Sequence, residues 1–169
     1  LQKYPQSKQA SDISMRLAIT LDKLKERPAS AKIYRSLWEA SPNAAGREHG
    51  LQAAIRFAES SKREDIAAGA ELAQEMVERL PNDAFSTAIA LRGFEQWNRI
   101  SEWAKANVIA NKLLAKNQPS DAEERRALLR QVAENYARQN QHANAVANLQ
   151  QSRAIRVDQE AHYQHISRM

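Results

Sequence analysis

Cysteine is absent from the 169 residues, which excludes disulfides, thiolate zinc sites and cysteine nucleophiles. Glycine and proline are scarce, at four and five residues, so the chain has few places to turn and its elements must be long. Aromatic residues make up only 6%, and strong helix formers such as Ala, Gln, Glu, Arg and Leu dominate instead. No apolar run approaches the roughly 20 residues that span a membrane. The composition therefore predicts a helical protein.

The positive charge is concentrated in the N-terminal part of the chain. Residues 1–35 hold eight Lys or Arg against three acids, and the remaining residues are balanced at 17 of each, which together give the net charge of +5. A basic end of this kind can meet an acidic protein, a nucleic acid or an anionic membrane, or it can be a solvated helix face. The chain begins at Leu1 without Met and shows no signal peptide. We interpret it as a segment of a longer protein.

Proline marks a regular period. Pro5, Pro42, Pro81 and Pro119 are separated by 37, 39 and 38 residues, in the similar contexts KYPQS, ASPNA, RLPND and NQPSD. A fixed period of this length is typical of a solenoid array with one supersecondary unit per repeat. We therefore expect a single helical-repeat domain over 1–169, with repeats at about 6–42, 43–81, 82–119 and 120–158 and a further helix at 159–169.

Each period contains two stretches with apolar residues at helical spacing, which predicts four helical hairpins. In the fourth unit Ser120 is the expected N-cap, and Glu123 completes a capping box. The first helix of that unit should end near Asn140, and the second should run over about 142–156. The residues expected to point inward, unit by unit, are Met15, Ala18, Leu21, Leu24, Ala31, Tyr34, Leu37 and Trp38; Leu51, Ala54, Phe57, Ala70, Ala73, Met76, Val77 and Leu80; Ala88, Leu91, Phe94, Trp97, Trp103, Ala106, Ala110, Leu113 and Leu114; and Leu129, Val132, Ala133, Tyr136, Ala145, Leu149 and Ser152.

The fourth unit resembles a tetratricopeptide repeat. That family favours a large apolar residue, a small residue and an aromatic in the first helix, then an Ala opening the second helix, another large apolar residue and a closing Pro or Asp. The matching residues here are Leu129, Val132, Ala133, Tyr136, Ala145, Leu149 and Asp158. In the other units Ala31, Ala70 and Ala106 open the second helix. The units are longer than the family's usual length of about 34 residues.

The resemblance implies an all-α, right-handed superhelical solenoid whose first helices line a concave groove. Such a groove binds a peptide or a partner domain, without enzymatic activity and without a cofactor. The residues that the resemblance places at the groove are Arg16, Lys23, Gln52, Glu59, Phe94, Trp97, Arg130 and Glu134. Phe94 and Trp97 follow the small Gly93 by one and four residues, which would expose them to the groove. The alternative is that both rings pack between the third and fourth units.

The opening stretch KYPQSKQASDISMRLA is similar to a subgroup of bacterial envelope lipoproteins in which Tyr-Pro-x-Ser precedes a repeat helix. This favours the periplasm or cell envelope over the cytoplasm. One alternative function is a non-catalytic superhelical domain of an envelope protein related to peptidoglycan or polysaccharide. A second is a nucleic-acid-binding helical repeat, although residues 1–35 offer only Tyr4 and Tyr34 for base stacking.

No pattern of catalytic residues stands out. The four glycines are scattered, so no phosphate-binding loop is present. His162 and His165 would share a helix face near Glu160, but a third strong metal ligand is lacking, and no metal site is expected. The most visible acids, such as Glu59, lie among basic neighbours and are interpreted as surface charge. The sequence predicts a binding protein.

Overall fold

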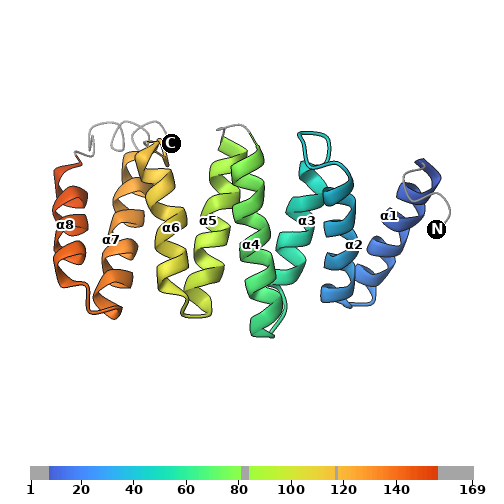
Figure 1. Cartoon of the computed structure of the whole chain (residues 1–169), viewed down its shortest axis with the longest axis horizontal. Helices are drawn as coiled ribbons and strands as arrows, with labels where there is room; N and C mark the ends of the chain where they lie inside the picture. The colour runs from blue at the N-terminus through green and yellow to red at the C-terminus, as the bar shows by residue number, and fades with distance from the viewer. Residues whose placement is uncertain (1–7, 81–83, 117, 156–169) are drawn as a thin grey trace, which may run out of the picture. The chain divides into compact units, whose positions relative to one another are not determined.

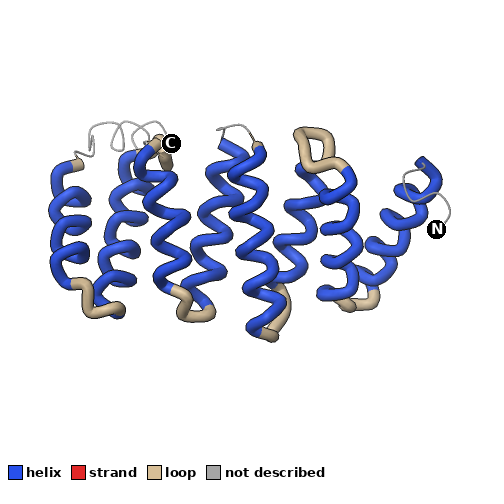
Figure 2. Tube along the Cα trace, in the orientation of Figure 1, coloured by secondary structure: helices blue, strands red, loops and turns tan. Residues whose placement is uncertain are grey.

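The computed structural model of the chain describes residues 8–80, 84–116 and 118–155. All regular structure in these ranges is helical and no strand occurs in them, which confirms the predicted all-α class there (Figure 2). The expected helix at 159–169 lies outside the described residues. The helices are α1 (Lys8–Lys23), α2 (Arg27–Ala40), α3 (Arg47–Ala58), α4 (Arg63–Arg79), α5 (Ala84–Arg99), α6 (Trp103–Ala115), α7 (Ala122–Arg138) and α8 (His142–Ala154).

The chain divides into two compact units, residues 1–109 and residues 110–169, with the boundary inside α6. In the first unit the helices from α1 to α5 pack against one another in chain order (Figure 1). In the second unit α7 packs against α8. Pro42 and Pro119 lie in the connections after α2 and α6, whereas Pro5 and Pro81 lie outside the described residues. The division into four repeats of a single domain stays a prediction.

Alternate helices of the first unit also contact each other, which arranges them in two layers. The first helices of the hairpins, α1, α3 and α5, form one layer, and α2 and α4 belong to the other. The linking pairs are Asp22–Arg56 from α1 to α3, Arg47–Phe85 from α3 to α5, and Arg35–Glu75 from α2 to α4. The layer of first helices therefore presents its own continuous outer surface.

Glycine sets the spacing between the helices of the first unit. A Cβ at Gly69 of α4 would lie 2.9 Å from the carbonyl oxygen of Ala54 in α3. A Cβ at Gly93 of α5 would lie 3.0 Å from the Cβ of Ala73 in α4, and one at Gly50 of α3 would lie 2.7 Å from a methionine sulfur of α4. Contacts this short leave no room for a side chain. Three successive helices thus approach their neighbours more closely than any larger residue allows.

Most of the residues expected to point inward are buried. The four alanines assigned to second helices, Ala31, Ala70, Ala106 and Ala145, are all buried. Ala70, however, does not open its helix, because α4 begins at Arg63 and Ala70 lies two turns further on. In the first hairpin the buried Ser30 hydroxyl of α2 donates to the Ala18 carbonyl of α1 at 2.9 Å. Small residues therefore mark the helix contacts, as the resemblance implies.

Three of the expected inward positions are wrong. Leu24 follows the last residue of α1 and is 66% exposed, and Leu149 of α8 is 41% exposed. Among the described helices only α7 is seen to pack against α8, so only a narrow stripe of α8 is covered. Ala88 of α5 is exposed, whereas the polar neighbours Ser86 and Thr87 are buried. The hydrophobic pattern misplaced the core face there because it favours apolar residues over buried hydroxyls.

The N-cap of α7 is also shifted by one residue from its prediction. The Oδ1 atom of Asp121, and not the Ser120 hydroxyl, accepts the backbone N–H of Glu124 at 2.8 Å. Both residue types are favourable caps, and the helix begins at Ala122. Its end at Arg138 and the span of α8 lie within two residues of the predicted bounds.

Three of the turns within hairpins share one geometry. Lys25, Ser101 and Asn140 adopt φ angles of 61°, 62° and 59°, in the left-handed region. At the first of these turns the N–H of Glu26 donates to the Leu21 carbonyl at 2.9 Å, and equivalent bonds end α5 and α7. This Schellman arrangement satisfies the last carbonyls of each helix. Because Ser101 and Asn140 are 39 residues apart, the turns follow the same period as the prolines.

Glycine at the left-handed positions should stabilise the protein. Lys25→Gly and Ser101→Gly remove a Cβ that crowds the following carbonyl, and each should raise the free energy of unfolding by roughly 1 kcal/mol. Asn140→Gly should gain less, because Asn tolerates this conformation. Urea unfolding measures the change, with the exposed Ser36→Gly in the interior of α2 as a control that should lose stability. A loss of stability in Lys25→Gly would contradict the turn geometry.

Candidate interaction surface

Each of three first helices carries one solvent-facing stripe. On α5 and α7 every member of the stripe is exposed, whereas Gln52 and Ile55 on α3 are half-buried. The stripes consist of Glu48, Gln52, Ile55 and Glu59 on α3, of Ala88, Arg92, Glu95 and Arg99 on α5, and of Ala127, Gln131, Glu134 and Arg138 on α7.

The shared turn geometry fixes how α5 and α7 correspond. Matching Ser101 to Asn140 offsets the two helices by 39 residues. At that offset a buried residue of α5 stands at the place of each buried residue of α7. The pairs are Ile89 with Leu128, Ala90 with Leu129, Gly93 with Val132, Phe94 with Ala133 and Gln96 with Asn135. The exposed stripes coincide at the same offset, so the two helices are used in the same way.

Phe94 and Trp97 do not belong to the exposed stripe. Each is 1% exposed, so the expectation of an exposed aromatic pair is wrong. The 39-residue correspondence gives the reason, because Phe94 itself takes the place of the small Ala133. Counting from Gly93 instead shifts the predicted face by one residue. The Lys105 ammonium lies 4.3 Å from the centre of the Trp97 ring and helps to cover it.

A buried Trp97 has a measurable consequence. Trp97→Ala should lower the free energy of unfolding by about 3–5 kcal/mol, because it leaves a cavity in the core of the first unit. The control is Val108→Ala, which shortens a 47% exposed side chain beside the same ring and should change stability by less than about 0.5 kcal/mol. Thermal melts of both variants measure the difference. An unchanged melting temperature for Trp97→Ala would return the ring to the surface.

The structure places the other predicted groove residues on three helices. Arg16 and Lys23 are exposed on α1, and Arg130 and Glu134 are exposed on α7 of the second unit. The remaining two are already engaged: Gln52 donates to Glu48 Oε1 at 2.8 Å, and Glu59, directly after α3, pairs with Arg27 at 3.0 Å. Sequence reasoning missed Arg92 and Glu95, which the offset from Asn140 would have located.

Asp22 lies at the centre of a charged network at the end of α1. Arg56 Nε donates to its two carboxylate oxygens at 2.8 and 2.6 Å, and Arg27 Nη1 donates to Oδ1 at 2.8 Å. Burial raises the pKa of Asp22, but the hydrogen bonds from Arg56 and Arg27 outweigh it and hold the pKa below its usual value of 3.8. The network joins two hairpins through a carboxylate that is only 14% exposed.

Stability should therefore fall in acid partly through Asp22. A carboxyl with a lowered folded-state pKa contributes fully above its unfolded value, and the contribution disappears as the pH falls below about 4. Asp22→Asn should cost about 1–3 kcal/mol at pH 7, because two arginines lose an ionised acceptor. Urea unfolding between about pH 2 and pH 7 should show a shallower acid decline in the variant than in the parent. Equal declines would mean that Asp22 is not held ionised.

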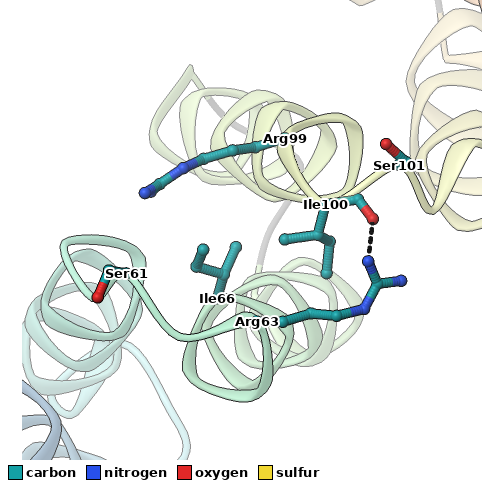
Figure 3. Close-up of a pocket in the computed structure, with 6 residues that line it drawn as sticks. All are labelled: Ser61, Arg63, Ile66, Arg99, Ile100 and Ser101. Atoms are coloured by element: carbon teal, nitrogen blue, oxygen red, sulfur yellow. Dashed lines mark hydrogen bonds between the residues drawn. The ribbon is translucent and has the colours of Figure 1, made fainter.

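Arginines also cap helix ends across hairpins. Arg99 donates to the Ala58 and Ser60 carbonyls at 2.6 and 3.2 Å, and Arg63 donates to the Ile100 carbonyl at 2.6 Å. Figure 3 shows the two side chains extending in opposite directions over a hollow of about 300 Å³. Because the guanidinium groups diverge and each is bound to carbonyls, they do not converge on an anion. Their role is to satisfy the last carbonyls of α3 and α5.

The described residues show no built catalytic or metal site. They contain no group of three or more His, Cys, Asp or Glu side chains that could hold a metal ion. His162, His165 and Glu160 lie outside the described residues. None of the helices in the described ranges is long and apolar enough to cross a membrane.

Comparison with known proteins adds no relative. No family model matches the chain, and no curated protein matches it. The resemblance to tetratricopeptide repeats therefore rests on the residues quoted above.

Proposed function

We propose that the chain is a non-enzymatic protein-interaction scaffold related to tetratricopeptide repeats. Its four hairpins continue in a right-handed superhelix, and a peptide or partner domain binds along the stripes of the first helices. A periplasmic or cell-envelope location is part of the proposal and rests on the similarity of the opening residues to envelope lipoproteins. The binding stripe replaces the predicted aromatic pair by polar residues.

The observation that carries the proposal is the pair Arg92 and Glu95 on α5. Both are exposed, and neither forms an ion pair within the described residues. Neighbouring arginines on this layer are used to hold the fold, as Arg56 and Arg99 are. Ala88 keeps the stripe shallow one turn earlier, so the backbone of a bound segment can approach α5. Unpaired charges beside a small residue favour recognition of a polar segment.

Differences between the stripes supply direction. At the places of Arg92 and Glu95, α7 carries Gln131 and Glu134. A bound segment would meet a basic residue on one helix and an amide on the other, so only one orientation satisfies both. Nucleic acid is the weaker candidate, because Glu95 and the acids of the α3 stripe repel phosphate.

A charge swap tests the stripe. Arg92→Glu with Glu95→Arg keeps the net charge but reverses the pattern, and it should abolish capture of the partner from a lysate while leaving the melting temperature within a few degrees. The matched control swaps Lys32→Glu with Glu71→Lys, two exposed charges on the layer of second helices. Quantitative mass spectrometry compares the captured proteins. The proposal fails if both swaps capture the same proteins as the parent.

A further inference from the structure

The first helix carries an apolar face that the fold does not use. Ile13 and Leu17 on α1 and Leu24 at its end are 53%, 47% and 66% exposed. Their spacing of four and seven residues places them on one side of the helix. The core-facing side is different, and it is marked by the buried Ala18 and by Asp22. We call Ile13, Leu17 and Leu24 the outer stripe of α1.

This concentration is unusual within the molecule. Seven large hydrophobic residues are exposed among the described residues, and four of them, Ile19 and the three residues of the outer stripe, fall between positions 13 and 24. The remaining three are divided between α6 and α8. Single exposed apolar residues are normal on a protein surface, but a row of them along one helix marks an interaction site.

Basic residues flank the outer stripe. Arg16 and Lys23 are exposed on α1 and form no ion pair within the described residues, and Lys25 is exposed directly after Leu24. Arg27, by contrast, is held by Asp22 and Glu59. Asp12 is the exposed acid of α1, at the N-terminal end of the stripe. The flank therefore carries an excess of unpaired positive charge along most of its length.

We propose that the outer stripe of α1 docks an amphipathic helix whose polar flank is acidic. From Ile13 to Leu24 the stripe spans about 16 Å, or roughly three helical turns. A partner helix with leucine-like side chains along one face would cover the three residues. Glutamates or aspartates beside that face would meet Arg16 and Lys23. This surface is separate from the α5 pair of the proposed function.

Charge and size argue for this occupant over two others. A second copy of the chain would bring two sets of Arg16 and Lys23 together, and three exposed side chains are far fewer than the roughly 20 residues a side of a stable interface. An anionic membrane would also attract the basic flank. Helices that lie in a membrane surface, however, use Trp and Phe as well as Leu, and the exposed apolar residues of α1 are all aliphatic.

Three synthetic peptides test the proposal by fluorescence anisotropy with the full chain. Each is a stapled helix of about 14 residues, because unstapled helices of that length are marginal in water. The first carries a leucine stripe with glutamate flanks, the second the same stripe with lysine flanks, and the third glutamate flanks with serine in place of leucine. Only the first should bind at micromolar concentrations, and its affinity should fall as the salt concentration rises.

Variants of the chain connect binding to the stripe. Leu17→Ser and the pair Arg16→Glu with Lys23→Glu should each weaken binding of the first peptide by about tenfold or more. Val108→Ser is the matched control, since Val108 and Leu17 are both 47% exposed, and it should bind as the parent does. All of these side chains are exposed, so the melting temperatures should stay close to that of the parent.

Several results would overturn the proposal. Equal binding of the acidic and basic peptides, undiminished binding by Leu17→Ser, or no binding of the first peptide would each do so. A dimer seen by sedimentation that Leu17→Ser dissociates would assign the stripe to a second copy instead. Co-sedimentation with phosphatidylserine vesicles that Leu17→Ser abolishes, without any preference for the acidic peptide, would assign it to a membrane surface.

Discussion

Close approach of helix backbones at glycine and alanine is the constraint on which the rest of the first unit depends. Gly69 admits the Ala54 carbonyl, and Gly93 admits the side chain of Ala73, so α3, α4 and α5 stack without spacers. Large rings such as Trp38 and Trp97 then fill the remaining space. Since glycine is unfavourable inside a helix, the packing that it permits must outweigh its cost of about 1 kcal/mol. The small residues therefore determine which face of each helix is buried and which is left to solvent.

At the turns, arginine carries out a task that backbone contacts cannot. The last carbonyls of a helix have no partner within it, and the ends of α3 and α5 receive Arg99 and Arg63 from one another's hairpins. Arg56 reaches Asp22 in the same manner. A guanidinium is always charged and offers several donors, so one side chain can bind two acceptors of a neighbouring hairpin. These arginines are committed to the fold, which is why the few unpaired ones are informative.

Much of the fold was predictable because it depends on local pattern. Proline spacing and apolar periodicity placed the hairpins, and the alanines of the second helices are buried as expected. The failures concern register. Phe94 occupies a place that holds alanine one repeat later, so a search for the family's small residue selected Gly93 and turned the helix by one position. The turn at Ser101 fixes the true register, but serine is rarely left-handed and gives no signal in a sequence. Buried Ser86 and Thr87 misled the pattern for a similar reason, because hydroxyls can satisfy themselves on a helix backbone.

The two candidate surfaces differ in what could have revealed them. The outer stripe of α1 is a second apolar face on a helix whose core-facing side is already supplied by residues such as Met15 and Ala18, so an excess of aliphatic residues was visible in the sequence. Arg92 and Glu95 gave no such excess, since charged residues are expected on any helix surface. They become distinctive only when the partners of the surrounding arginines are known. A binding site made of ordinary surface residues is thus recognised by what the fold leaves unused, and that requires the contacts as well as the sequence.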